Sequence, residues 1–422
     1  MKQIAVAILT LNPNQLGSST VRIPLALRRA FLILVLLFLF AAELGRIYLL
    51  MPLPGSQVSE TVDIAYWFDR HMLWIRLITL FIIGLVLINT MRNGRTWEKI
   101  SLSLIVLAYV PLFYILNLRM AADHKFLQPG VKSFIPAAKS LDKSKLVIGV
   151  VINGEAKAYP IQLIGYHHQV ADTVGNQPVF ITYCTVCRTG RVYSSLLHGR
   201  NETFRLVGMD HYNAVFEDQT TKTWWQQASG KGIAGPLKGE TLKEIPSTQT
   251  TIESWMRQYP NSVVMDGDPQ FDEKYFGLED YDKGTMQSSL VKRDYSPWQP
   301  KSWIVGVRNE SSSKAFDWSY LVKKRVIQDS VDALPILVTM EADTTSFHVY
   351  DRRVNGLTLT FDAALENDHI TDKITGSVWN MEGRCIEGAM KDTQLKSVQA
   401  YNEFWHAWER FEPKAKKYSL KE

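Results

Sequence analysis

Ile148-Gly-Val-Val-Ile-Asn-Gly-Glu-Ala-Lys-Ala-Tyr-Pro160 decides the organisation of the chain, because the same pattern returns as Val305-Gly-Val-Arg-Asn-Glu-Ser-Ser-Ser-Lys-Ala-Phe-Asp317. Later positions recur in the same order: Val179-Phe-Ile-Thr182 as Ile336-Leu-Val-Thr339, Gly230 and Gly235 as Gly383 and Gly388, and Trp255 and Pro260 as Trp408 and Pro413. A repeat in constant order indicates duplicated structural units. We therefore predict two homologous modules, residues 140–266 and 302–415, joined by a connector of residues 267–301.

Short apolar runs dominate each module and predict strands. The runs are rich in β-branched residues and are bounded by Gly, Pro, Asn or Asp. In the first module they cover about residues 146–152, 178–184, 191–197 and 203–208. A helix is predicted over Thr250–Pro260, which has capping threonines, apolar positions at helical spacing and a terminating proline, and Tyr401–Pro413 repeats it. The predicted fold of the modules is therefore α+β and rich in β-structure.

Residues 1–120 are typical of a membrane anchor with three transmembrane helices. The apolar runs Phe31–Leu50, Met72–Met91 and Ile100–Leu118 are each close to the roughly 20 residues that cross a bilayer. Glu43 and Arg76 interrupt these runs, and we expect the two side chains to snorkel or to pair between helices rather than to mark an ion path. The lipid bilayer is thus the first expected partner of the chain.

The distribution of positive charge predicts the orientation of this anchor. Basic residues precede the first run and separate the second run from the third, namely Arg22, Arg28, Arg29, Arg92, Arg95 and Lys99. Such residues are enriched on the cytoplasmic side of membrane proteins. A cytoplasmic N-terminus and three spans place both modules on the other side of the inner (cytoplasmic) membrane, in the periplasm or outside the cell.

Two of the three cysteines stand close together in Ile181-Thr-Tyr-Cys184-Thr-Val-Cys187-Arg-Thr-Gly190, at the predicted exit of an apolar strand. The third, Cys385, is distant in sequence, which excludes a disulfide-dense scaffold. The second module keeps the strand but has Glu341 and Thr344 where the thiols would stand. The cysteines are therefore not expected to be needed to stabilise the fold. If the two thiols act together, their sulfur atoms must lie close to each other.

Imidazoles precede the cysteines in Tyr166-His167-His168-Gln-Val-Ala-Asp172, whereas the second module has Lys323, Lys324 and Arg325 in that stretch. Thiols and imidazoles are thus lost together. Two thiolates with one or two imidazoles suit zinc or copper(I). The predicted ligands of a copper or zinc ion are Cys184, Cys187 and His168, and further candidate ligands are His167, Met209 and His211. Asp172 is expected to orient one of these ligands through a hydrogen bond, without contacting the metal itself.

Two other functions stay open at this stage, and with them whether the protein is an enzyme. In a thiol–disulfide oxidoreductase, one cysteine attacks a partner disulfide and the other resolves the mixed product; Arg188 and Arg191 are placed to lower a thiol pKa. A thioredoxin-type site begins a helix, however, whereas the residues after Cys187 predict a turn into another strand. The second alternative is a non-catalytic module that binds or assembles an envelope protein partner.

Nucleic acids and nucleotides are not expected as ligands. The net charge of +5 is small and dispersed, and no basic stripe with interleaved aromatic residues is present in the sequence. Gly230-Lys-Gly-Ile-Ala-Gly235 satisfies the pattern GxGxxG, but Pro236 follows, whereas a dinucleotide-binding turn must open a long helix. We predict instead a backbone turn with positive φ at Gly230 and Gly235.

Several motifs occur together in the order typical of one family. They are His168-Gln-Val-Ala-Asp172, Val174-Gly-Asn-Gln-Pro-Val-Phe-Ile-Thr-Tyr-Cys-Thr-Val-Cys187, Trp225-Gln-Gln227, Gly232-Ile-Ala-Gly-Pro-Leu-Lys-Gly239, Pro246-Ser247 and Arg293-Asp-Tyr295. In these motifs the chain resembles the bacterial family called domain of unknown function 3179 (DUF3179), whose typical form has HEVVND, TYCPLC and GPLxG.

The resemblance covers the chain from about residue 146 onward and leaves out the membrane anchor. It places His168, Asp172, Cys184 and Cys187 at motif positions of the family, while Gln169 and the pair Thr185-Val186 depart from its pattern. It implies no established activity.

Overall fold

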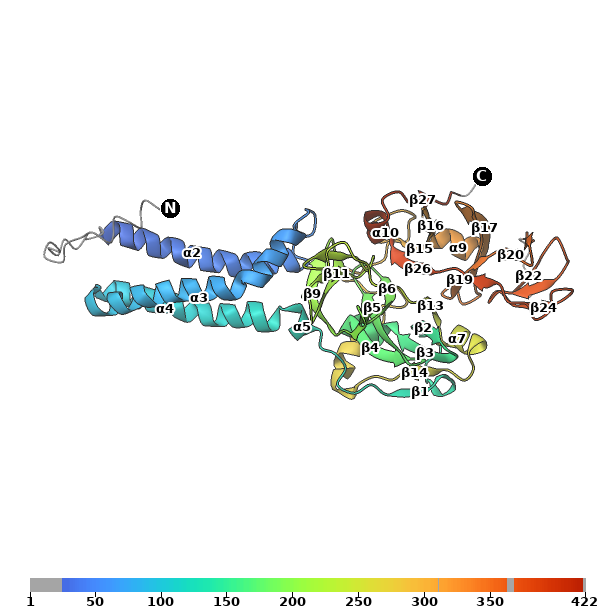
Figure 1. Cartoon of the computed structure of the whole chain (residues 1–422), viewed down its shortest axis with the longest axis horizontal. Coiled ribbons are helices and arrows are strands. Elements are labelled where there is room, and N and C mark those ends of the chain that lie inside the picture. Colours follow the sequence, from blue (N-terminus) through green and yellow to red (C-terminus); the bar gives the residue numbers. More distant parts are fainter. Residues whose placement is uncertain (1–24, 310, 363–367, 420–422) are drawn as a thin grey trace. The chain divides into compact units, whose positions relative to one another are not determined.

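Figure 1 shows the computed structural model of the chain, in which residues 25–309, 311–362 and 368–419 are described. Arg22, one of the residues behind the predicted orientation, lies outside these ranges. The chain forms two compact units: one comprises Phe68–Tyr114 and the described residues up to Gly45, and the other comprises Arg46–Trp67 and the chain from Ile115 onward. The segment 46–67 thus folds with the modules, although its sequence groups it with the anchor.

Within the described residues, three long apolar helices form the membrane part of the chain. They are α2 (Leu25–Leu50), α3 (Val62–Asn93) and α4 (Thr96–Tyr114), and a π-helix, η2 (Ile115–Arg119), follows α4. Each provides a stretch long and apolar enough to cross a membrane, within Arg29–Leu50, Val62–Asn93 and Thr96–Arg119. The three predicted spans are therefore confirmed as membrane-type helices, and they associate the chain with a membrane.

Glu43 joins these helices through polar contacts. Its carboxylate accepts hydrogen bonds from Arg76 at 2.7 and 2.8 Å and from the Tyr109 hydroxyl at 2.7 Å. Glu43 is only 1% exposed, and a charge removed from water needs such partners. Pairing between helices, one of the two expected uses of Glu43 and Arg76, is what the structure shows.

The first module combines three sheets. The five-stranded sheet has the order β1 (Phe134–Pro136), β14 (Val263–Met265), β3 (Glu155–Pro160), β2 (Leu146–Ile152), β13 (Ser247–Thr251). A three-stranded sheet contains β4 (Gln169–Val174), β5 (Gln177–Cys184) and β6 (Thr189–Ser194), and a four-stranded sheet has the order β12 (Gly232–Ala234), β11 (Trp224–Gln226), β10 (Asn213–Asp218), β9 (Phe204–Asp210). The helices are α5 (Ala122–Lys125), α6 (Ile161–His167) and α7 (Ile252–Gln258), and α8 (Asp272–Phe276) opens the connector.

The second module repeats this plan. Its sheets have the orders β26 (Ala400–Phe404), β15 (Trp303–Arg308), β16 (Ser313–Asp317), β27 (Lys416–Lys417); β17 (Val326–Val331), β18 (Leu334–Met340), β19 (Phe347–Asp351), β25 (Lys396–Ser397); and β22 (His369–Thr371), β23 (Val378–Asn380), β24 (Cys385–Glu387). Its helices are α9 (Trp318–Lys324) and α10 (Trp405–Phe411). Small hairpins, β7 (Leu196–Leu197) with β8 (Arg200–Asn201) and β20 (Arg353–Val354) with β21 (Leu357–Thr358), occupy corresponding places in the two modules.

Strand pairing and packing confirm that the modules are duplicates. The order β13-β2-β3-β14 recurs as β26-β15-β16-β27, and each ends in a parallel pair of strands. Trp255 of α7 packs against Gly149, and Trp408 of α10 packs against Gly306 in the same way. A Cβ atom at these glycines would lie 2.2 Å and 2.4 Å from the respective rings, so only glycine fits. The predicted α+β, β-rich tandem fold is confirmed.

The predictions of single strands and helices were confirmed where apolar residues recur at a regular spacing. Elements without such a spacing were not predicted. Strand β2 matches the predicted range, and Thr251 caps α7 by accepting a hydrogen bond from the Ser254 N–H. The short helices α6 and α9 were not predicted. Nearly all residues of α6 are buried, so its sequence lacks the one-sided apolar pattern that identifies a surface helix.

Each module contacts the other through the strand that precedes its last helix, β13 in the first and β26 in the second. The Phe404 N–H, at the end of β26, donates to the Cys187 carbonyl at 3.0 Å, and the Thr251 N–H, at the end of β13, donates to Ser346 Oγ at 3.2 Å. A buried ion pair between Arg191 and Glu403, which are 2% and 1% exposed, lies in the same interface. The two modules therefore share a polar interface, to which the corresponding strands β13 and β26 both contribute.

We expect Glu403→Met to lower the free energy of unfolding by about 3 kcal/mol, because it leaves the buried Arg191 guanidinium without its main counter-charge. The loss is at the lower end for a broken buried pair, since Glu244 stays 3.7 Å from Arg191 Nε. Asp392→Asn, which breaks an exposed pair with Arg384, should cost less than about 1 kcal/mol. Denaturant unfolding of the full chain in detergent, monitored by tryptophan fluorescence, measures both changes in the free energy of unfolding. Equal losses in the two variants would contradict the stabilising role of the Arg191–Glu403 pair in the module interface.

Candidate functional site

Cys184 and Cys187 meet at one point inside the first module. Cys184 ends β5 and pairs with Thr189 of β6, so residues 185–188 form the turn between the two strands. Both cysteines are fully buried and free of a disulfide. Their sulfurs lie 3.5 Å and 3.2 Å from the same acceptor, the carbonyl oxygen of Tyr212. The convergence expected of the two thiols is thus present in the structure.

The two thiols are not equivalent. A hydrogen bond from the Cys187 thiol lowers the pKa of Cys184, and backbone N–H groups of Cys187, Ala214 and Val186 add to this effect against the cost of burial. Burial raises the pKa of Cys187 well above its usual value, and the neighbouring Cys184 raises it further. Cys184 is therefore the first of the pair to form a thiolate.

The carbonyl between the thiols comes from a strained turn. His211 and Tyr212 form the two-residue connection between β9 and β10, with φ of +50° and +65°. Such hairpin turns favour Asn-Gly, and bulkier residues adopt this conformation only where the surroundings hold it. Here Gln57 Oε1 accepts a hydrogen bond from the Tyr212 N–H at 3.3 Å, and Arg410 donates to His211 Nε2 at 2.8 Å. Backbone strain next to two buried thiols marks this turn as part of a site.

Three of the predicted site residues are engaged elsewhere. His167 uses both ring nitrogens, Nδ1 with the Leu127 carbonyl and Nε2 with the Tyr275 hydroxyl at 2.7 Å. His211 likewise uses both, since Nδ1 bonds Asp210 at 2.8 Å and Nε2 accepts from Arg410. Asp172 accepts hydrogen bonds from Tyr159 at 2.7 Å and from Lys157 at 3.3 Å. In this arrangement neither histidine offers a lone pair, and Asp172 orients neither a thiol nor an imidazole.

His168, by contrast, is arranged like a ligand. It follows α6 in the left-handed conformation with φ of +61° and is 3% exposed. Its Nδ1 donates to the Tyr183 carbonyl at 2.9 Å, so Nε2 carries the lone pair. Burial lowers the pKa of His168 to about 4, and the nearby His167 and Lys125 lower it further. The ring is therefore neutral at neutral pH, with its tautomer fixed by a carbonyl, as in many metal-binding histidines.

A cavity of about 210 Å³ lies beside the thiol pair, and His168 lines it together with three methionines, Met51, Met209 and Met286. Val186 and Ala214 also line it, and the backbone N–H groups of these two residues point at Cys184. Because Thr185 and Val186 lie between the two cysteines in the chain, the cavity adjoins the cysteine turn. Met51 and Met286 were not predicted, because neither stands near the cysteine motif in sequence and a lone methionine has no local signature.

The donor set can be compared with what each predicted metal requires. Structural zinc takes four ligands in a tetrahedral arrangement. Within the described ranges, no three side chains of His, Cys, Asp or Glu come together as a preformed set. Copper(I) accepts thiolate and thioether sulfur. Two converging thiols beside a methionine-lined cavity therefore fit copper(I) better than zinc.

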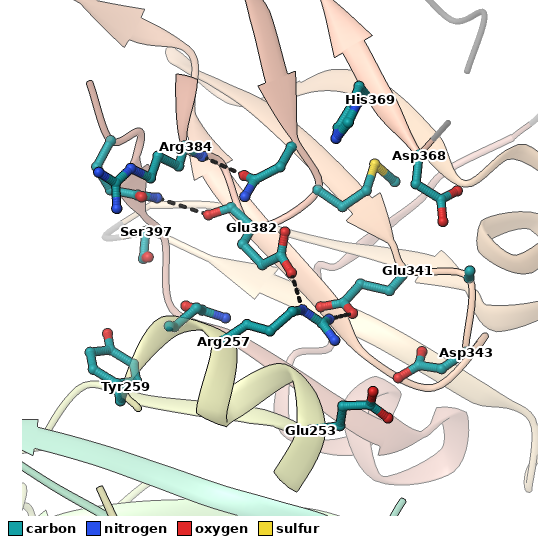
Figure 2. Close-up of a pocket in the computed structure, with 15 residues that line it drawn as sticks. Glu253, Arg257, Tyr259, Glu341, Asp343, Asp368, His369, Glu382, Arg384 and Ser397 are labelled. Atoms are coloured by element: carbon teal, nitrogen blue, oxygen red, sulfur yellow. Dashed lines mark hydrogen bonds and ion pairs between the residues drawn. The ribbon is translucent and has the colours of Figure 1, made fainter. Parts of the chain in front are cut away.

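A polar cavity adjoins the turn of the second module that corresponds to the cysteine turn of the first. This cavity, of about 730 Å³, is lined by α7 and by the turn after β18, where Glu341 occupies the position equivalent to Cys184 (Figure 2). Figure 2 shows Arg257 bridging Glu341 and Glu382. Glu341 also accepts hydrogen bonds from Ser254 and from His348. These charges satisfy one another across the module interface, so the network serves to join the modules.

Fold and site together define a membrane-associated tandem β-rich protein with a buried thiol pair in one of its two modules. The chain belongs to the family described as protein of unknown function (DUF3179), whose model matches residues 126–415, that is, both modules and the connector. The resemblance noted in the sequence is therefore confirmed. No curated protein and no solved structure is significantly similar to the chain.

The buried His168 should make the protein sensitive to mild acid. Its folded pKa of about 4 lies below the roughly 6.5 of an unfolded histidine, so only the unfolded state takes up a proton between these values. The free energy of unfolding should therefore fall as the pH drops from about 6.5 to 4, by as much as about 3 kcal/mol.

We expect His168→Asn, which tolerates the left-handed backbone, to make this decline shallower. His198→Asn is the matched control, because His198 also has positive φ but is exposed. Melting temperatures measured across this pH range test the prediction, and parallel curves for wild type and His168→Asn would contradict it.

Proposed function

We propose that the protein binds copper(I) as cargo, with Cys184 and Cys187 as the principal ligands. The observation that carries this proposal is the convergence of both sulfurs on one carbonyl oxygen, 3.5 Å and 3.2 Å away, beside a cavity lined by methionine and a neutral histidine. Thiolate, thioether and imidazole are the groups that copper(I) prefers in proteins. Of the residues that line this cavity, His168 and Met209 were expected from the sequence as metal ligands.

The environment of the thiols is suited to a soft monovalent ion. Burial opposes a second negative charge on the pair, which is why the pKa of Cys187 is raised. A bound cation offsets that charge, so binding releases the protons of both thiols. Full burial of the sulfurs also favours a small ion over a large substrate.

The full chain, purified anaerobically in a reducing, chelator-free buffer, should bind about one copper(I) per chain at the thiol pair. The variant Cys184→Ser, Cys187→Ser should lose this tightly bound ion, because both thiolates are gone. Cys385→Ser is the matched control, since Cys385 is equally buried but belongs to the second module. Elemental analysis and competition with a copper(I) chelator measure the effect. Equal copper in wild type and the double variant would exclude the pair, and zinc in place of copper would overturn the choice of metal.

The difference between the two thiols favours a second candidate function, thiol–disulfide exchange. In that reaction the Cys184 thiolate attacks a sulfur of a partner disulfide, and the partner's other sulfur leaves and takes up a proton. The Cys187 thiol then loses its proton and attacks Cys184 in the mixed disulfide, which releases the partner's second thiol. The partner gains two electrons and two protons, and the pair ends as a disulfide. Rapid reduction of a small disulfide by metal-free protein would support this function, and a pair inert to both disulfide and copper would leave the third hypothesis, binding of an envelope protein.

For location, we propose that the modules lie outside the cytoplasm, on the periplasmic or outer side of the inner membrane. Support comes from the basic residues that flank the spans and from the three membrane-type helices found within the described residues. Alkaline phosphatase fused after Glu422 should be active, and the same enzyme fused after Asn93, between the second and third helices, should be inactive. The opposite pattern would reverse the orientation.

A further inference from the structure

We infer that Met51, Met209 and Met286, together with His168, form a second and weaker binding site for copper(I), through which the ion reaches the thiols. The inference rests on the proposed function, because it gives the ion a route to Cys184 and Cys187. All four residues line the cavity of about 210 Å³ beside the thiol pair. The site is distinct from the pair in its ligands, which are uncharged at neutral pH.

The three methionines reach this cavity from separate parts of the chain. Met51 directly follows α2, Met209 belongs to β9, and Met286 lies in the connector between the modules. Each is partly exposed, whereas both cysteines are fully buried. The methionines are therefore more accessible to solvent than the thiols.

One close contact fixes the first methionine beside the second. Gly208 lies against Leu50, and a Cβ atom at residue 208 would be only 2.4 Å from the Leu50 carbonyl oxygen. Glycine at this position allows the segment after α2 to lie directly on β9. The segment carries Met51, and Met209 follows Gly208 in the strand, so the two methionines belong to adjacent backbone segments that both line the cavity.

The charges around the cavity select the kind of ion. Among the residues that the structure describes, no Asp or Glu lines it, and Lys125 is the charged residue in its lining. Hard divalent cations such as Ca²⁺ or Mg²⁺ require oxygen ligands, usually carboxylates. Thioether sulfur and the neutral His168 Nε2 bind soft ions without a compensating negative charge. The lining therefore suits a soft monovalent cation.

The cavity adjoins the cysteine turn. Val186 and Ala214 line the cavity, and their backbone N–H groups point at the Cys184 sulfur. Cys184 ends β5 and is followed directly by Thr185 and Val186 of the cavity lining. Transfer from neutral thioethers to a thiolate is favourable, because the anionic ligand binds the cation more strongly.

The test uses silver(I), a redox-inert ion with similar ligand preferences, and the full chain in detergent. The variant Cys184→Ser, Cys187→Ser should still bind about one silver ion, more weakly than the wild type does. Adding Met51→Leu and Met286→Leu should weaken this residual binding by at least about 10-fold. Adding Met390→Leu instead, in the core of the second module, is the matched control and should leave it unchanged. Calorimetric titration measures binding, and melting temperatures verify folding.

A second measurement, the rate of silver uptake, tests the role of the methionines separately from binding at the thiols. With both cysteines present, Met51→Leu and Met286→Leu should preserve silver binding at the thiols but slow its uptake by at least about 10-fold. Loss of all residual binding in the cysteine variant, or residual binding unaffected by the methionine changes, would overturn the inference while leaving the thiol site intact. Residual binding that depends on the methionines, in a protein whose thiols take up no metal, would support the second site and overturn the proposed function.

Discussion

The hydrogen bond from the Phe404 N–H to the Cys187 carbonyl is the contact on which the site depends, because it holds the turn between β5 and β6 from outside its own module. Neighbouring residues act in the same direction: Asn402 accepts from Arg188, and Glu403 pairs with Arg191. Lys301, whose pKa burial lowers to about 8, donates to the Val186 carbonyl at 2.7 Å. The second module and the end of the connector thus cover and fix the cysteine turn, which explains how a short loop keeps two sulfurs together without a bond between them.

Duplication explains why this interface exists and why its two halves differ. The end of β13 and α7 contact the turn after β18 just as β26 contacts the cysteine turn, so each module covers the corresponding turn of the other. In one turn the space holds two thiols beside an apolar cavity, and in the other Glu341 is saturated by Ser254, Arg257 and His348. A carboxylate with three partners locks an interface, whereas thiols that share one carbonyl remain able to change partners. The same fold therefore carries a fixed polar network around Glu341 in one module and a reactive thiol pair in the other.

Segments distant in sequence meet again at the turn formed by His211 and Tyr212. Gln57, between the first two long helices, binds the Tyr212 N–H, and Arg410 of α10 binds both His211 and Glu60. The turn that presents its carbonyl to the thiols is therefore held by the segment after α2 and by the second module. Its unfavourable backbone conformation persists because these contacts compensate for it.

The sequence by itself determined the duplication, the three membrane-type helices, the β-rich class and the pairing of Cys184 with Cys187. These features rest on local pattern: apolar length, alternation, turn residues and a repeat in constant order. Sequence could not rank the neighbouring histidines, because His167 ends a helix facing Tyr275 whereas His168, one residue later, turns in the left-handed conformation toward the cavity. Nor could it find Met51 and Met286, which join the site only through contacts between segments far apart in the chain. Side-chain direction and long-range packing are properties of the folded chain, and they alone decided which of the polar and sulfur-containing residues share one site.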